Sequence, residues 1–271
     1  MLKKLFKTLA LACLAGIFFT QHTADCEPTK TQWLDKKVAF LGDSITDPNT
    51  IKGQKLYWSF LADSLGIAPK VYGISGQRAA HIPAQARELQ AETNGDIDAI
   101  LIFIGTNDFN SSIPLGQWFT PATTAAAEVC NTPAGTRQYR TLSKDPNTFR
   151  GALNTALEYI KKTFPDKQVV LLTPIHRSSA IFSKTNVQPD ESYSNRLGLF
   201  IHDYVAAIKE AANIWAVPVI DLNSLCGLYP SLPAHAKYFA NPKTDLLHPN
   251  ELGHKRIAET LKYQLPTLPV Y

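Results

Sequence analysis

Cysteine is scarce in this chain, and the four cysteines, Cys13, Cys26, Cys130 and Cys226, include no C-x-x-C pair. A zinc site built on cysteine is therefore not expected, and no other metal-ligand cluster is visible in the sequence. An exported chain can form disulfides, and Cys130 with Cys226 is one candidate pair. Spacing does not decide how Cys26, Cys130 and Cys226 connect, so the pairing stays open.

The chain also carries little excess charge of either sign. The formal net charge is +4, and three lysines among residues 1–24, which contain no acidic residue, account for most of it. No run of lysine and arginine and no basic stripe is present, which argues against a nucleic-acid partner. Apolar residues make up 45% and charged residues 18% of the chain. We therefore expect residues 25–271 to bury a sizeable core as a single α/β domain.

Long hydrophobic runs are missing as well. The uninterrupted apolar stretch near the N-terminus, Leu9–Phe19, has eleven residues, whereas a transmembrane helix needs about 20. Because three lysines precede this stretch, residues 1–24 are predicted to be a secretion signal. The chain is expected to be exported, to the periplasm or the extracellular space, without a transmembrane segment. Lipidation at Cys13 or Cys26, and a buried N-terminal helix, are the alternatives that stay open.

Five short apolar runs, each followed by turn or polar residues, predict buried strands: Val38–Leu41, Lys70–Ile74, Ala99–Ile104, Val169–Thr173 and Val217–Leu222. Segments with a helical period predict helices: Leu56–Leu65, Phe149–Phe164, Leu199–Ile214 and Asn250–Tyr263. Buried strands that alternate with amphipathic helices are typical of a parallel sheet with helices on both faces. The predicted fold class is therefore α/β, in three α/β/α layers.

Two long segments, residues 110–147 and 177–195, do not fit this alternation and are predicted to be functional loops on the ligand side of the sheet. The first contains Trp118, a candidate substrate contact. Arg177, at the start of the second, is interpreted as a solvated charge.

Polar residues follow four of the predicted strands, and the carboxyl ends of parallel strands face one ligand crevice. Ser44 follows the first strand, Gly76 the second, Asn107 the third and His176 the fourth. The backbone N–H groups of Ser44 and Gly76 and the side-chain amide of Asn107 are suited to bind an oxyanion. His176 and Arg78 are candidate substrate contacts.

A serine hydroxyl becomes a useful nucleophile only when an oriented base takes its proton. Ser44 lies on the turn after a buried strand, and Asp245 and His248 supply a carboxylate and an imidazole three positions apart. The bland alternative is that Ser44 caps a helix, and His254 is the fallback base. Asp43 and its counterpart after the third strand, Asp108, are predicted to brace loops.

Four blocks carry a family resemblance: Gly42-Asp43-Ser44-Ile45, Gly76, Gly105-Thr106-Asn107-Asp108 and Asp245-x-x-His248-Pro249. They resemble, in order, the signature blocks of the SGNH (GDSL-type) hydrolases. The resemblance implies a flavodoxin-like parallel five-stranded sheet, ester hydrolysis through an acyl-enzyme, and neither metal nor cofactor. It also implies Ser44 as the nucleophile, His248 as the base, Asp245 as its orienter, and an oxyanion hole of Ser44, Gly76 and Asn107. Gln77-Arg78 departs from the small residues common after the second block, so Arg78 is expected to shape the substrate site.

The predicted function is a secreted serine esterase for small-molecule or glycan esters, most specifically an O-acetylesterase acting on carbohydrate. The carbohydrate part rests on analogy, since a fold does not determine a substrate. One alternative is a lysophospholipase or thioesterase type of acyl hydrolase on longer chains. The other is a glycan-binding protein that uses the hydrolase scaffold without turnover.

Overall fold

The computed structural model of the protein describes residues 30–122 and 139–271. The predicted secretion signal and Cys13, Cys26 and Cys130 lie outside the described residues, and so do the lipidation and disulfide predictions that depend on them. Cys226 is buried, and burial raises the pKa of its thiol to about 11. None of the helices in the described part of the chain has the length and apolar character needed to cross a bilayer.

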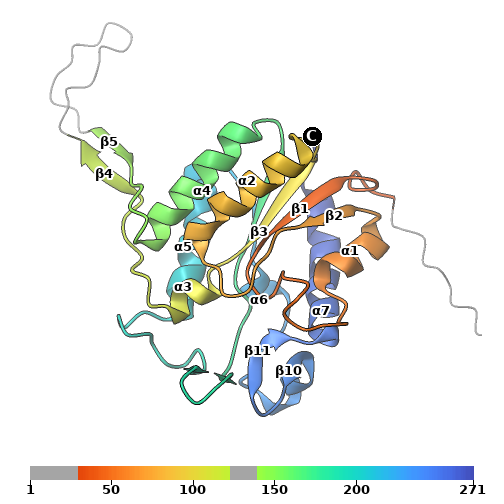
Figure 1. Ribbon diagram of the computed structural model, residues 1–271, viewed down its shortest axis with the longest axis vertical. Helices are drawn as coiled ribbons and strands as arrows, with labels where there is room; N and C mark the ends of the chain where they lie inside the picture. Colours follow the sequence, from red (N-terminus) through yellow and green to blue (C-terminus); the bar gives the residue numbers. More distant parts are fainter. Residues whose placement is uncertain (1–29, 123–138) are drawn as a thin grey trace, which may run out of the picture.

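A five-stranded parallel sheet runs through the centre of the protein (Figure 1). Its strands are β1 (Lys37–Gly42), β2 (Ala68–Val71), β3 (Ala99–Phe103), β6 (Gln168–Leu172) and β9 (Val219–Ile220), in the spatial order β2-β1-β3-β6-β9. Every residue of β3 and β6 is buried, as expected for strands that are covered on both faces. The strand order reverses between β1 and β3, and this is the place where α/β sheets of this topology bind ligands.

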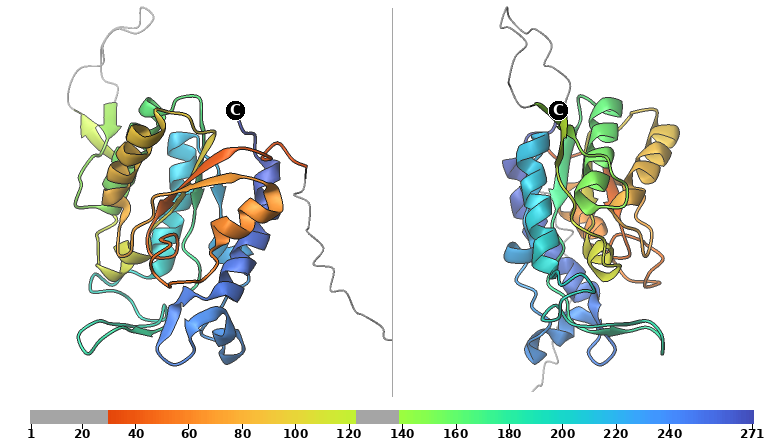
Figure 2. Two further views of the ribbon diagram at one scale, coloured as in Figure 1. Left: turned by 45° about the vertical axis from the view of Figure 1, so that its right-hand side comes forward. Right: turned by 90° about the vertical axis from the view of Figure 1, so that its left-hand side faces the viewer.

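Helices cover both faces of the sheet, so the predicted three-layer α/β/α architecture is confirmed. α1 (Tyr57–Leu65) and α7 (Glu251–Gln264) pack side by side on one face (Figure 2, left). α2 (Ile82–Thr93), α4 (Phe149–Thr163) and α5 (Ile201–Trp215) cover the other face. Each face has its own apolar core, because alternate side chains of the strands point to opposite sides.

The predicted boundaries of the main elements are close to those observed, with two informative differences. The strand expected over Lys70–Ile74 is β2, which lies earlier in the chain, at Ala68–Val71. The strand expected over Val217–Leu222 is only Val219–Ile220, and the chain then enters the short helix α6 (Leu222–Leu225). α2 has no counterpart among the predicted helices.

The segment 177–195 was expected to be a loop, but it contributes two strands to a second sheet. β7 (Ala180–Ile181) and β8 (Val187–Gln188) form an antiparallel hairpin, and β7 pairs with β11 (Asp245–Pro249). β11 also pairs with β10 (Phe239–Asn241). This small four-stranded sheet lies at the end of the molecule where the carboxyl ends of the main strands meet (Figure 1).

The segment 110–147 also contains regular structure. β4 (Phe119–Ala122) and β5 (Tyr139–Leu142) pair as a two-stranded antiparallel ribbon. In both Figures 1 and 2 this ribbon lies at the opposite end of the molecule from β11. The expectation that both long segments line the ligand side is therefore wrong for the ribbon.

Candidate active site

Ser44 lies on a tight turn directly after β1, and its neighbours hold that turn in place. A side chain at Gly42 would put its Cβ 2.6 Å from the Phe103 carbonyl oxygen, so only glycine fits there. The buried Gln85 amide accepts from the Gly42 N–H and donates to the Gly42 carbonyl, each at 2.8 Å. Asp43 accepts from the Ile45 N–H at 3.0 Å. The serine is thus presented by a rigid backbone at the end of a buried strand.

Asp245 and His248, both on β11, complete a chain of hydrogen bonds to Ser44. His248 Nε2 lies 2.9 Å from Ser44 Oγ, and His248 Nδ1 lies 2.9 Å from Asp245 Oδ2. Asp245 Oδ1 accepts from the backbone N–H of Leu247 at 3.1 Å and of His248 at 3.0 Å. Asp245 Oδ1 therefore helps to fix the backbone that carries the imidazole, while Oδ2 contacts the imidazole itself. This arrangement has the connectivity that proton removal from a serine hydroxyl needs.

The pKa values of Asp245 and of Asp43, which precedes Ser44 in the chain, are shifted in opposite directions. Burial raises the pKa of Asp245, but its hydrogen bond to His248 and the charge of His248 lower it by more, so the net pKa is below the usual range. Burial raises the pKa of Asp43 to about 6, and its hydrogen bond from Ile45 offsets only part of this. Asp245 is therefore ionised at neutral pH and can balance an imidazolium.

The three candidate oxyanion donors follow β1, β2 and β3: Ser44 and Gly76 lie on turns, and Asn107 lies in the short helix α3 (Thr106–Asn110). The backbone N–H groups of Ser44 and Gly76 donate to no acceptor among the described residues. Gly76 has a φ of +78°, a left-handed conformation that glycine adopts without strain. One hydrogen of the Asn107 amide goes to the Gln77 carbonyl oxygen at 3.0 Å, which leaves the second hydrogen for another acceptor.

Two buried carboxylates hold the Gly76 turn on either side. Asp47 accepts from the Ser75 N–H at 2.9 Å. Asp108 accepts from the Ala79 N–H, with both oxygens within 3.2 Å, so its predicted bracing role is confirmed. Burial raises the pKa of Asp108 to about 7. Asp47 was not among the predicted site residues, although its place three residues after Ser44 was available as a signal.

His254, the fallback base, lies behind the site rather than beside the serine hydroxyl. Its ring stacks on Tyr57, with centroids 6.1 Å apart, and burial lowers its pKa to about 3. His254 lines a small cavity together with Ser44 and His248, of about 10 Å³. A second cavity of about 10 Å³ lies beside Asp43. Each has room for about one water molecule, so neither holds an acyl chain.

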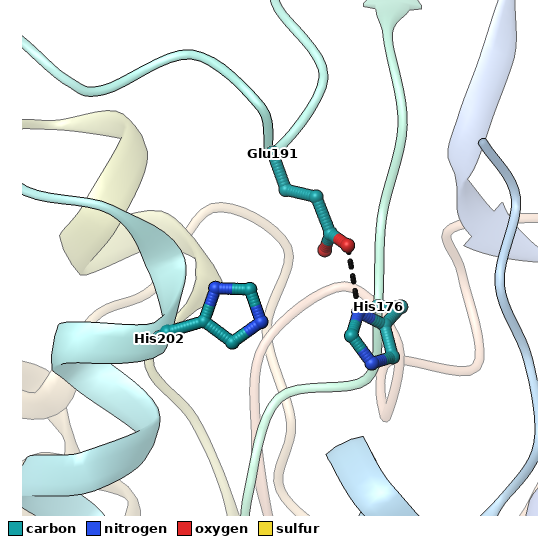
Figure 3. A group of neighbouring side chains, drawn as sticks. All are labelled: His176, Glu191 and His202. Atoms are coloured by element: carbon teal, nitrogen blue, oxygen red, sulfur yellow. Dashed lines mark hydrogen bonds and ion pairs between the residues drawn. The ribbon is translucent and has the colours of Figure 1, made fainter.

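The three predicted substrate contacts are placed in different surroundings. Arg78 stands on the turn after Gly76, and its charge lowers the pKa of Asp108. His176 instead lies next to Glu191 and His202, with His176 Nδ1 2.6 Å from Glu191 Oε1 (Figure 3). Arg78 thus follows Gly76 by two residues in the chain, and His176 has partners outside the triad.

Trp118 packs against the helices α4 and α5. Its indole N–H donates to Glu210 at 2.6 Å, its carbonyl oxygen accepts from Asn154, and its ring lies beside the Arg150 guanidinium. These contacts do not support the predicted place of Trp118 at the substrate.

Arg177 was interpreted as a solvated charge, and this is wrong: only 1% of the residue is exposed. Its guanidinium donates to Asn110 Oδ1 at 2.6 Å and to Gln188 Oε1 at 2.9 Å. Burial lowers its pKa to about 10, although the charges of Glu191 and Asp245 raise it in part. Periodicity does not reveal a buried arginine, because its partners come from distant segments.

The comparison with protein families decides the assignment. The model of the GDSL-like lipase/acylhydrolase family matches residues 40–256. The chain belongs to this family. The match includes Ser44, Asn107 and His248, so the predicted resemblance is confirmed, and family membership supports an ester hydrolase.

Several solved structures with this fold are similar to this protein. A protein of Lactobacillus plantarum is 27% identical with a TM-score of 0.67, over 86% of this chain and 98% of that one. A lipase/acylhydrolase of Enterococcus faecalis is 17% identical with a TM-score of 0.51, over 86% and 96%. A catalytic mutant of an acetylxylan esterase of Geobacillus stearothermophilus is 18% identical with a TM-score of 0.51, over 86% and 94%. No curated protein matches the chain.

Proposed function

We propose that this protein is an exported serine esterase that hydrolyses carboxylic esters through an acyl-enzyme, with short acyl groups on carbohydrate as its substrates. The observation that carries the proposal is the chain of two 2.9 Å hydrogen bonds from Ser44 through His248 to Asp245. Few structural roles need a half-buried carboxylate, an imidazole and a hydroxyl in that order, whereas acyl transfer needs all three.

In the proposed mechanism, Ser44 Oγ attacks the ester carbonyl carbon while His248 Nε2 takes the hydroxyl proton. The carboxylate of Asp245 stabilises the imidazolium, and the negative charge on the carbonyl oxygen is received by the N–H groups of Ser44 and Gly76 and the Asn107 amide. The leaving alcohol then takes the proton from His248. Water, activated by the same imidazole, hydrolyses the acyl-enzyme and releases the acid.

The small space around Ser44 favours a short acyl group. The cavities beside Ser44 and Asp43 are about 10 Å³ each, and an acetyl group does not need a deep pocket. The acetylxylan esterase of Geobacillus stearothermophilus has the same fold, so this framework is compatible with acetyl removal from a glycan. Export of the chain rests on the N-terminal sequence alone.

A second candidate function, hydrolysis of longer acyl chains, is favoured by the apolar hairpin beside the histidine. The Phe182 ring lies 5.4 Å from the His248 ring, centroid to centroid. Phe182 and its neighbours Ile181 and Val187 are exposed. An acyl chain could lie along this surface even though the serine has no deep pocket.

Initial rates of the purified chain on p-nitrophenyl acetate, butyrate and octanoate test both candidates, with Ser44→Ala as the control. Activity confined to the shortest ester and lost in the variant supports the short-chain proposal and justifies assays on acetylated glycans. A preference for octanoate favours the second candidate. Activity that persists in Ser44→Ala would overturn the proposed nucleophile.

A further inference from the structure

A second cluster of reactive side chains lies apart from Ser44. His176, Glu191 and His202 each offer a ligand atom, and these atoms all lie within 4.8 Å of one another. Figure 3 shows the His202 ring turning one nitrogen toward the other two side chains, with the carboxylate of Glu191 next to the His176 ring. The three residues come from separate segments: the segment between β6 and β7, the stretch between β8 and α5, and the first turn of α5.

The carboxylate of Glu191 is held in a fixed orientation, with one of its two oxygens directed at His176. Glu191 is 6% exposed, and its Oε2 accepts from the Arg177 backbone N–H at 3.1 Å. Its other oxygen, Oε1, faces His176 Nδ1 at 2.6 Å. Such a division, in which one oxygen is fixed by the backbone and the other is directed at the site, is the outer-shell support that metal-ligating carboxylates have.

We propose that His176, Glu191 and His202 bind a divalent metal ion of the zinc type. Two imidazoles and one carboxylate are ligands that Zn²⁺ takes in three-residue sites, with water in the remaining position. Zinc–ligand distances of about 2.0–2.1 Å put tetrahedral ligand atoms about 3.3 Å apart, and the present spacings of 2.6 Å and up to 4.8 Å bracket that value. His202 is exposed, so the ion has access from solvent.

Binding needs only a local proton shift. The hydrogen between His176 Nδ1 and Glu191 Oε1 gives way to the ion, and the neutral imidazole carries its proton on Nε2 instead. His202 also binds as the neutral imidazole, and Glu191 as the carboxylate. Because a metal ion and a proton compete for the same ligand atoms, metal affinity is expected to fall as pH falls.

The ion would tie the stretch between β8 and α5 to the segment between β6 and β7. That stretch follows the β7–β8 hairpin, which carries Phe182 beside His248. The cluster shares no side chain with the proposed triad. This inference and the proposed function therefore stand or fall separately.

Zinc binding to the chelator-stripped protein tests the site. We expect isothermal titration with ZnCl₂ to give one ion per chain, and Co²⁺ to give the visible absorption of a four-coordinate site. Zinc at a hundredfold excess over its Kd should raise Tm by about 5 °C or more. Trypsin cleavage after Arg196, within the segment that the ion ties down, should slow when zinc is bound.

His202→Ala and Glu191→Gln should lose the zinc titration and the zinc-dependent rise in Tm, while His235→Ala, at another histidine outside the cluster, should keep both. His202 is exposed, so His202→Ala is expected to fold, and its metal-free Tm checks this. Ser44→Ala should bind zinc as the wild type does. The proposed site is overturned if the wild type does not bind zinc. It is also overturned if zinc binding persists in both cluster variants and disappears in His248→Ala.

Discussion

His248 Nε2 lies 2.9 Å from Ser44 Oγ, although 204 residues separate them in the chain. Ser44 comes from the main parallel sheet and His248 from the small antiparallel sheet at its carboxyl edge. The docking of these two sheets therefore creates the geometry on which the proposed chemistry depends.

Replacement of Asp245 tests whether the histidine needs its orienting partner. Ser44→Ala and His248→Ala should each lower kcat by about 10⁴–10⁶-fold, and Asp245→Ala by about 10³–10⁴-fold, because the imidazole loses its orientation but not its role. Steady-state rates on p-nitrophenyl acetate measure this, with Asp63→Ala, at an exposed position on α1, as the control. A loss within about twofold for Asp245→Ala would indicate a Ser–His dyad.

Asn107→Ala should lower kcat by about 10²–10³-fold and leave KM nearly unchanged. The reason is that an oxyanion donor acts in the transition state more than in the bound substrate. The matched control is Asn147→Ala, at an exposed asparagine. A rise in KM with kcat unchanged would instead indicate that Asn107 binds the ground state of the substrate.

The pH dependence of stability should report the buried carboxyl of Asp108. Its pKa is about 7 in the folded protein, against 3.8 ordinarily. Between these values the folded state holds a proton that the unfolded state has released, so this group makes stability fall as pH rises. Asp108→Asn removes the titration but keeps an oxygen that can accept from the Ala79 N–H.

The quantity to measure is the difference in Tm between Asp108→Asn and the wild type from pH 4.5 to 8. His254, with its pKa lowered to about 3, acts in the opposite direction below pH 6.5, and this contribution cancels in the difference. The variant should gain relative to the wild type as pH rises through this window. A constant difference would show that the Asp108 pKa is not raised, and Asp166→Asn, at an exposed site, should give a constant difference.

Arg177→Ala should lower the free energy of unfolding by about 3–5 kcal/mol. The substitution takes the charged donor from Asn110 Oδ1 and Gln188 Oε1, removes the positive charge next to the buried Glu191, and empties the space of a large buried side chain. Urea unfolding measures the loss. Arg140→Ala, at an exposed arginine whose guanidinium lies over the Phe119 ring, should cost far less. Equal effects of the two substitutions would contradict the structural role of Arg177.

Phe182→Ala separates the short-chain proposal from the long-chain candidate. If acyl chains lie on the β7–β8 hairpin, the loss of this ring should lower kcat/KM on octanoate about tenfold and on acetate much less, because the longer chain loses apolar contact. The short-chain proposal expects small and similar effects on both esters. Tyr193→Ala, at another exposed aromatic position, is the comparison variant.

Much of the fold was predictable because its signals are local. The strands β1, β3 and β6 are continuous apolar runs, and a strand that is covered on both faces has to be apolar throughout. The helices α1, α4, α5 and α7 were predicted to within two residues at each end, because their apolar residues repeat with the helical period. The short strands β7 and β8 escaped prediction because two-residue strands have no period to read.

The residues of the candidate site were also named from the sequence, since each follows a strand or belongs to a compact block. Their distances were not predictable. His248 meets Ser44 only because the small sheet that contains β11 lies at the carboxyl ends of the main strands.

The amino-acid sequence alone specified the α/β layers, the family and the reactive residue types, because burial and periodicity act along the chain. The tertiary structure decided which distant side chains meet. It buried Arg177, and it turned His176 away from the triad toward Glu191 and His202. The physical reason is that these contacts join segments far apart in the chain, and no local pattern encodes a contact that chain folding must first bring together.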